Sequence, residues 1–290
     1  MAFNTKQHDK VLQRTLDEID SGVFDNAKAL ENEIAELVAL GLPAETVRPQ
    51  IITAFNRYSE TVRSVAQPLT DISQDYLDQS VLPTELADQS TANTLLITSQ
   101  DTLSTTVNTM SEDVVSTVVL ATVAGLTVNS IVNQVRGRIS GIQMDTNNPS
   151  IRKLQRKLRK MQLTPGVDAK EIAATVAAIR AALPGDVNTS ASLITRLRTA
   201  ADSIVGSFDG AFAKARATRL GISRFRYEGG LIETSRPFCR DMLGRELNID
   251  EIQSKWSGSS WKGKEPGDPF VVRGGYNCRH YWVPIESEED

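Results

Sequence analysis

The residues with the most evident chemistry are the two cysteines and one of the two histidines, all near the C-terminal end. Cys239 belongs to the stretch SRPFCRDMLGRELN, and Cys278 and His280 belong to GGYNCRHYWVPI. Two thiolates and an imidazole are ligands that zinc prefers. A compact CxxC pair is absent from the sequence, and Asp241 is the nearest candidate for a fourth ligand. Cys239, Cys278 and His280 therefore form a candidate zinc site.

The same three residues are also compatible with states that contain no metal, and the sequence does not decide between them. The cysteines could form a disulfide after oxidation, or they could be a buried pair of reduced thiols with His280 hydrogen-bonded nearby. A catalytic pair, with Cys239 as nucleophile and His280 as base, is a further alternative. The sequence contains neither a GxxxxGK[ST] phosphate loop nor a GxGxxG dinucleotide fingerprint. Since no catalytic pattern is recognisable, we expect that the chain is not an enzyme.

Charge is distributed unevenly along the 290 residues, although the net charge is only −4. Residues 1–113 contain 7 Lys and Arg against 18 Asp and Glu, residues 114–230 contain 17 against 7, and residues 231–290 contain 8 against 11. Such asymmetry indicates segments with different partners, or helix faces that are simply solvated. The first ten residues, MAFNTKQHDK, lack an apolar core. We therefore expect no signal peptide, and synthesis in a reducing cytoplasm.

The strongest candidate for binding nucleic acid is a basic stretch after the turn TNNPS. It contains six basic residues and no acid: Arg152, Lys153, Arg156, Lys157, Arg159 and Lys160. Lys and Arg clustered on one helix face attract phosphates without recognising sequence, and they attract an acidic protein surface equally well. A second basic patch is made of Lys214, Arg216, Arg219, Arg224 and Arg226. DNA and an acidic partner, which residues 1–113 could themselves supply, both remain candidates.

Apolar residues spaced by three or four predict a succession of helices through the first two-thirds of the chain. The predicted helices cover residues 12–23, 34–41, 47–65, 103–139 and 194–215, with loop and short helix over 68–93. The stripe over 103–139 begins at Leu103 and continues through Val128 and Val132 to Ile139, which predicts one long helix. It has no charge between Asp113 and Arg136 but many Thr, Ser and Asn residues. We therefore expect packing in a bundle, and no stable membrane span.

The last part of the chain has a different pattern of residues, which is typical of short strands. ISRFRYEGGLIET alternates around a Gly-Gly pair, which predicts strands joined by a turn, and PFVVRGG and YWVPI predict further short strands. The predicted fold class is mainly α, with a long-helix N-terminal body and a small C-terminal α+β module. The predicted segments are a helical body over 1–145, a basic helical segment over 146–222 and the module over 223–290.

The module's sequence resembles the C-terminal module of phage Mu F-like minor head proteins, also called phage head morphogenesis proteins. The residues that carry this resemblance are Thr234, Ser235, Arg236, Cys239, Gly244, Asn277, Cys278, Arg279 and Pro284. His280 stands where the family often has a second cysteine, and Gly-Gly-Tyr replaces the family's usual His-Pro. The resemblance covers residues 223–290 and does not extend to the helical body.

The resemblance implies a structural virion protein made in the host cytoplasm and located in the capsid interior or at the portal vertex. Its implied partners are portal and capsid proteins, with packaged DNA as a further candidate, and its implied role is head assembly, with DNA packaging or ejection in some phages. Several copies per particle are expected. Arg236, Cys239, Cys278, Arg279 and His280 would hold the module together. An alternative function is an internal or ejected virion protein that contacts DNA or the host envelope through the 103–139 helix.

Overall fold

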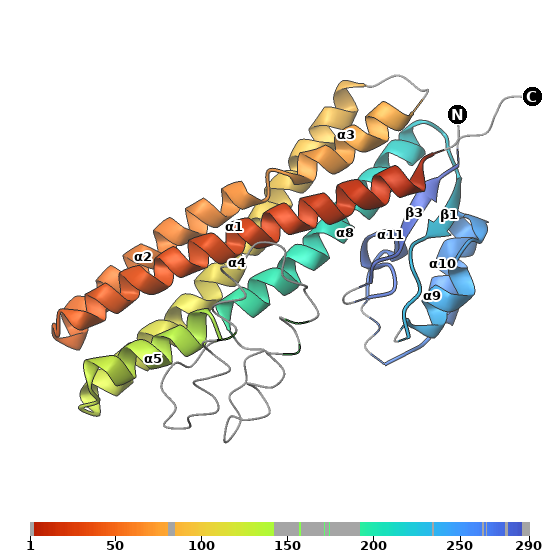
Figure 1. The fold of residues 1–290 in the computed structure, drawn as a ribbon. Coiled ribbons are helices and arrows are strands. Elements are labelled where there is room, and N and C mark those ends of the chain that lie inside the picture. The colour runs from red at the N-terminus through yellow and green to blue at the C-terminus, as the bar shows by residue number, and fades with distance from the viewer. Residues whose placement is uncertain are drawn as a thin grey trace, which may run out of the picture. The chain divides into compact units, whose positions relative to one another are not determined.

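Helices dominate the computed structural model, and a small sheet is formed by residues near its C-terminal end (Figure 1). The structure describes residues 3–80, 85–141, 157, 171, 174, 192–233, 235–262, 264, 266–275 and 278–285. The helices are α1 (Thr5–Ala39), α2 (Ala44–Val65), α3 (Leu69–Gln79), α4 (Leu86–Val123), α5 (Val128–Ile139), α8 (Leu193–Arg219), α9 (Pro237–Met242), α10 (Ile249–Gly258) and α11 (Pro269–Val272). The strands are β1 (Arg224–Glu228), β2 (Glu246–Asn248) and β3 (Tyr281–Pro284). The predicted fold class, mainly α with a small α+β module, is confirmed.

The chain divides into two compact units, each assembled from separated stretches. Unit 1 comprises Met1–Gly22, Val62–Ser104 and Arg198–Asp290, and unit 2 comprises Val23–Thr61 and Thr105–Leu197. This division differs from the three consecutive segments expected over 1–145, 146–222 and 223–290, which remain a prediction. Among the described residues, no helix has both the length and the apolarity needed to cross a bilayer.

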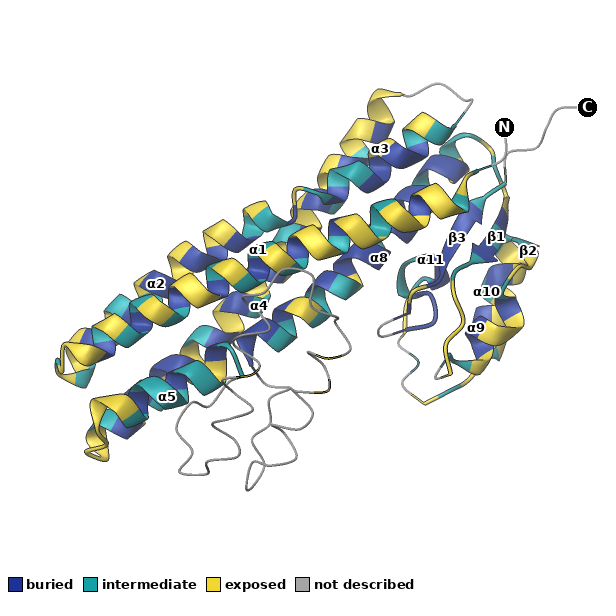
Figure 2. Ribbon diagram, in the orientation of Figure 1, coloured by how far each residue is buried: buried dark blue, intermediate teal, exposed yellow. Residues whose placement is uncertain are grey.

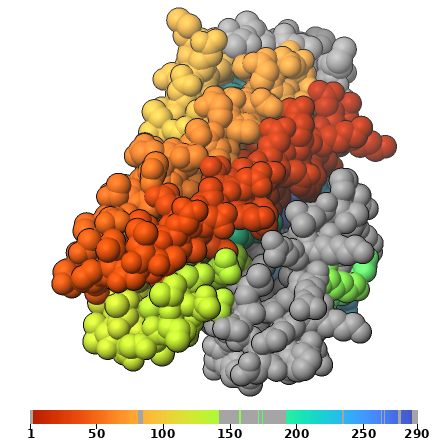
Figure 3. Space-filling view, turned by 60° about the vertical axis from the view of Figure 1, so that its left-hand side comes forward, coloured from red at the N-terminus to blue at the C-terminus, as the bar shows by residue number. Residues whose placement is uncertain are grey.

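Unit 2 is built from amphipathic helices that bury one face each. In this unit α1 and α2 lie side by side (Figures 1 and 3), and buried positions alternate with exposed ones along both helices (Figure 2). The Tyr58 hydroxyl donates to the Val23 carbonyl 3.2 Å away, and Arg136 of α5 pairs with Glu31 of α1 at 3.1 Å. The first prediction, of separate helices over 12–23 and 34–41, is wrong because α1 is continuous through both stretches.

The predicted single helix over 103–139 is also wrong. The structure has α4, which ends at Val123, and α5, which begins at Val128, and Gly125 between them adopts a positive φ of 69°. The Thr127 side chain accepts a hydrogen bond from the Ser130 backbone and caps α5. Of the expected apolar face of the second helix, Val135 and Ile139 are buried as predicted, whereas Val128 is exposed and Ile131 is buried instead.

The C-terminal module, within unit 1, is an antiparallel three-stranded sheet with short helices. Its strand order is β2-β1-β3, and Tyr227 of β1 pairs with Trp282 of β3. Alternation along β1 buries Phe225 and Tyr227 on one face. Helix α10 begins with a capping box in which Asn248 and Glu251 satisfy each other's backbone amides. The buried faces meet in a core formed by Ala217, Phe225, Tyr227, Phe238, Cys239, Met242, Ile252, Trp256, Phe270, Cys278 and Trp282.

Two local predictions in this module are wrong. The Gly-Gly pair does not form a hairpin: β1 ends at Glu228 and pairs with β2 and β3, while Ile232 lies outside any strand. A Cβ atom at Gly229 would lie 2.9 Å from the His280 Cα, so the glycine permits close passage of two chain segments instead. The PFVV stretch forms α11 and not a strand, because Asp268 caps it and Pro269 occupies its first turn.

A buried histidine fixes the start of α1 within unit 1. His8 is fully buried, with Nδ1 2.7 Å from an Asp75 oxygen on α3 and Nε2 3.0 Å from an Asp209 oxygen on α8. The Tyr76 hydroxyl donates to Asp209 at 2.9 Å, and the Tyr281 ring of β3 lies edge-on to the imidazole. Burial alone would lower the pKa of His8, but the two carboxylates outweigh it and raise the pKa to about 9.

Candidate metal centre

Two parts of the C-terminal module bring the two cysteines and His280 together. Cys239 lies in α9, which begins at Pro237, and Cys278 and His280 lie in the segment that leads into β3. All three side chains are buried, with the residues 1%, 5% and 4% exposed. The structure therefore brings together the three residues that the sequence singled out by type, although Cys239 and Cys278 are 39 positions apart.

The distances between their ligand atoms suit a tetrahedral metal. Cys239 Sγ lies 3.7 Å from Cys278 Sγ, and Cys278 Sγ lies 3.5 Å from His280 Nδ1. Two sulfurs bound to one tetrahedral zinc at about 2.3 Å are separated by about 3.8 Å, and a bound sulfur and nitrogen by about 3.6 Å. The ligand atoms of all three residues lie within 4.8 Å of one another. These residues could bind a metal ion.

Both cysteines are free thiols in the structure, because a disulfide would require the sulfurs to approach to about 2.05 Å. The hydrogen bond between the thiols lowers the pKa of Cys278 and raises the pKa of Cys239. His280 and the nearby charge of Arg273 lower the pKa of Cys278 further. The pair therefore favours one thiolate, which is the form that binds metal.

Three residues that the sequence pattern does not indicate surround this cluster. The Tyr227 hydroxyl lies 3.7 Å from Cys239 Sγ and 3.6 Å from Cys278 Sγ. Gly274 packs against both sulfurs, since a Cβ atom there would lie 2.4 Å from one and 2.8 Å from the other. Arg273 is buried, and its Nη1 donates to the His280 carbonyl at 3.3 Å. The glycine pair before Cys278 was the one local signal for a close approach at this site.

The other predicted site residues of the module lie at its edge. Arg236 is half-buried at the start of α9, and Arg279 is exposed, with its charge near Asp202 of α8. Asp241, which the sequence suggested as a fourth ligand, is exposed and accepts a hydrogen bond from Arg245 at 2.5 Å. Asp241 therefore binds Arg245 on the surface of the module, and the prediction of Asp241 as a ligand is not supported.

The geometry does not pair Cys239 with His280 as a nucleophile and its base. The imidazole of His280 shares its hydrogen bond with Cys278, and Cys239 is enclosed by Tyr227 and Gly274. Buried thiols without access for a substrate are usually inert. The arrangement favours a structural role for these residues, and the absence of enzymatic activity stays a prediction.

Most of the predicted basic stretch lies outside the described residues: Arg152, Lys153, Arg156, Arg159 and Lys160. Lys157 is described; it is exposed, and its Nζ lies 3.1 Å from a carboxylate oxygen of Glu171. At this position a basic residue meets an acid of the same chain. DNA binding by the stretch stays a prediction.

The second basic patch is engaged within unit 1. Arg216 of α8 is buried and pairs with the buried Asp88 of α4 at 2.6 Å. The remaining members also have acidic partners, with the pairs Lys214–Asp268, Arg219–Asp88, Arg219–Glu85, Arg224–Glu246 and Arg226–Glu228. Asp88 and Glu85 belong to the acidic part of the sequence. In this patch, therefore, the basic residues bind acidic residues of the same chain, which is one of the two alternatives that the sequence left open.

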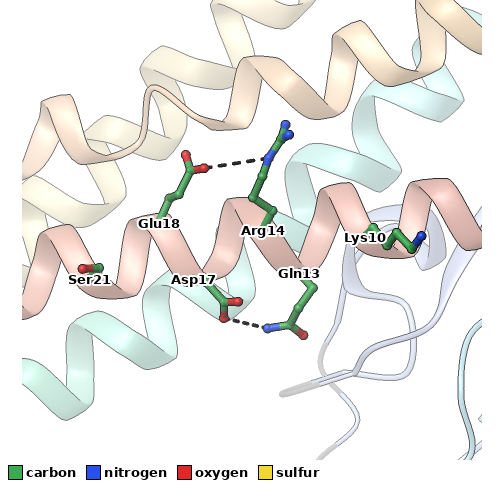
Figure 4. Close-up of a pocket in the computed structure, with 6 residues that line it drawn as sticks. All are labelled: Lys10, Gln13, Arg14, Asp17, Glu18 and Ser21. Atoms are coloured by element: carbon green, nitrogen blue, oxygen red, sulfur yellow. Dashed lines mark hydrogen bonds and ion pairs between the residues drawn. The ribbon is translucent and has the colours of Figure 1, made fainter. Parts of the chain in front are cut away.

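A shallow hollow also lies along α1 in unit 1 (Figure 4). It is lined by one stretch of that helix: Lys10, Gln13, Arg14, Asp17, Glu18 and Ser21. Gln13 donates to Asp17 at 2.8 Å, and Arg14 lies 3.8 Å from Glu18. Because these polar groups satisfy one another on a single exposed helix face, the hollow suggests no particular ligand.

Comparison of the chain with protein-family models, with curated proteins and with solved structures finds no match.

Proposed function

We propose that this chain is a structural phage head protein, a minor head protein that associates with the portal and capsid and assists head assembly. We further propose that a zinc ion bound by Cys239, Cys278 and His280 holds its C-terminal module together. The observation that carries both parts is the burial of these three side chains in one cluster, because Cys239 and Cys278 are also among the residues that carry the resemblance to phage head morphogenesis proteins.

The helical body supports a structural role. Its helices bury their apolar faces within the chain, and charged residues far apart in sequence pair with one another, as in Arg216 with Asp88. Such a body can present extended surfaces to neighbouring subunits. DNA packaging or ejection would be a further role, and the predicted basic stretch over 152–160 is the segment to test for it.

Zinc would stabilise a module that has little sheet. The three strands contain 5, 3 and 4 residues, and α9 and α11 contain 6 and 4. Small modules of this kind often need a metal or a cross-link to hold their loops. A closed zinc site contributes binding free energy directly to folding. The Lewis acidity of zinc is not required for this role.

The location is tested in particles of a phage that encodes this chain. Density-gradient-purified particles should contain the protein, as measured by quantitative mass spectrometry against the portal protein. A strain in which the gene is deleted should yield fewer filled heads by electron microscopy, and complementation should restore them. A protein that is absent from purified particles, together with normal head formation in the deletion strain, would exclude this function.

The metal is tested on the purified full-length chain. After dialysis, we expect about one zinc per chain by elemental analysis. Cys278→Ser should lose the zinc, because it removes a thiolate ligand, whereas the exposed Ser254→Ala in the same module should retain it. Chelation should lower the midpoint of thermal unfolding followed by tryptophan fluorescence, since all three tryptophans, Trp256, Trp261 and Trp282, lie in the module. Equal zinc contents in the two variants would contradict a site at the cysteines.

A further inference from the structure

The three ligands at the candidate metal centre leave one vertex of a tetrahedron to be filled. We propose that the Tyr227 hydroxyl oxygen is the fourth ligand, so that the zinc site is composed of Cys239, Cys278, His280 and Tyr227. This inference rests on the zinc proposal above and identifies a ligand that the sequence pattern does not suggest. Structural zinc sites are almost always four-coordinate and closed, so three protein ligands alone would be incomplete.

The position of the Tyr227 oxygen relative to the two sulfurs fits that vertex. It lies 3.7 Å from Cys239 Sγ and 3.6 Å from Cys278 Sγ, while the sulfurs lie 3.7 Å from each other. Cys278 Sγ also lies 3.5 Å from His280 Nδ1. Four of the distances between pairs of ligand atoms therefore fall between 3.5 and 3.7 Å. An oxygen and a sulfur bound to one tetrahedral zinc lie about 3.5 Å apart. The three atoms around the triangular face therefore already have the spacing that zinc requires.

The fold holds the phenol ring in this position. Alternation along β1 turns Tyr227 to the inside of the module, where it is fully buried. Its ring is stacked on His280 with the centroids 5.3 Å apart and the planes 6° apart, and it also packs against Trp282 and Phe238. A ring fixed on several sides needs little reorganisation to ligate a metal.

Gly274 and Arg273 complete the surroundings of the site. The absence of a side chain at Gly274 lets the backbone approach both sulfurs. Two thiolates and a phenolate around Zn²⁺ carry a net charge of −1. The buried guanidinium of Arg273 donates to the His280 carbonyl and supplies the compensating positive charge.

Binding is an exchange of ligands and protons, with no change in oxidation state. Zn²⁺ accepts an electron pair from each sulfur, from the imidazole nitrogen and from the phenol oxygen. The protons of the thiols and of the phenol pass to solvent or buffer. Ligation to zinc would convert the Tyr227 phenol to a phenolate, so zinc binding should produce a tyrosinate signal.

The experiment titrates the metal-free full-length chain with Zn²⁺ and follows near-ultraviolet difference absorption together with affinity in a competing chelator. The wild-type chain should gain the absorption of one tyrosinate per zinc bound. Tyr227→Phe keeps the ring and its stacking but should lose this signal and bind zinc at least about tenfold more weakly. Tyr281→Phe, on the neighbouring strand with its hydroxyl on Asp9, is the matched control and should keep both properties.

The outcomes separate this inference from the zinc proposal. Zinc binding by the wild type without a tyrosinate signal, or unchanged affinity in Tyr227→Phe, overturns Tyr227 as a ligand and leaves the three-residue zinc site standing. No zinc binding by the wild type overturns both. The wild-type titration needs no substitution, so the test remains decisive even if Tyr227→Phe fails to fold.

Discussion

Substitution of Gly210 by alanine is expected to destabilise unit 1 by about 3 kcal/mol. Gly210 lies on α8 where the backbone of α11 passes, and a Cβ atom there would lie 1.8 Å from the Phe270 carbonyl oxygen and 2.7 Å from its carbon. A backbone carbonyl cannot rotate away as the end of a side chain can. The C-terminal module would therefore have to separate from α8, which would expose apolar surface around Phe270.

The measurement is urea unfolding followed by fluorescence of the tryptophans in the module. Gly258→Ala is the matched control, because a Cβ atom at Gly258 meets nothing within 4 Å and its φ lies in the ordinary range. We expect the control to change stability by no more than about 0.5 kcal/mol. An unchanged midpoint for Gly210→Ala would show that α8 and α11 do not pack as described.

The second large effect concerns His8 and pH. The pKa of His8 in the folded protein is raised to about 9, against 6.5 for the free side chain, so the folded protein holds a proton that the unfolded chain releases. The resulting stabilisation is complete below pH 6.5 and is lost as the pH rises from 6.5 to 9. The loss should be on the order of 3 kcal/mol. Asp75 acts at the acidic end of the pH range. Burial alone would raise its pKa, but hydrogen bonds from His8 and Gln7 outweigh burial and lower it. The stabilisation that Asp75 contributes is therefore lost in acid.

Unfolding free energies at pH 6 and pH 9 test this expectation. The titratable groups in contact with the imidazole are Asp75 from α3, Asp209 from α8, and the tyrosines Tyr76 and Tyr281. The comparison of the two pH values must take all four into account. His8→Gln should abolish most of the pH dependence, and it should cost about 3 to 5 kcal/mol at pH 6, because it leaves two buried carboxylates without their cation. A wild-type protein that is equally stable at both pH values would refute the charged state of His8.

Sequence alone predicted the helices best where one face is buried along its full length. The stripes over 47–65 and 194–215 correspond to α2 and α8, because their apolar spacing matches a helix that packs on one side. Prediction failed where a few atoms decide the outcome. A positive φ at Gly125 divides a continuous apolar stripe into two helices, and the Asp268 cap turns a β-like PFVV stretch into a helix.

The candidate site was predictable by residue type but not by geometry. Cysteine and histidine are recognisable as ligands wherever they occur, so Cys239, Cys278 and His280 could be grouped. Tyr227 could not, since its place beside the sulfurs depends on the pairing of β1 with β3. The cluster around His8 was not predictable either, because its partners Asp75 and Asp209 lie 67 and 201 positions away.

The pairing of His8 with Asp209 has a consequence for synthesis on the ribosome. The two residues are 201 positions apart, and Tyr281 of β3, still further along the chain, completes the surroundings of His8. The first turns of α1 can contact Asp75 early, but their contacts with Asp209 and Tyr281 cannot form until α8 and β3 have been translated. Folding of unit 1 is consequently late and slow, since long-range contacts must close large loops. A chain truncated before β3 would lack Tyr281 beside His8, and chaperones and proteases would recognise the surface that stays exposed.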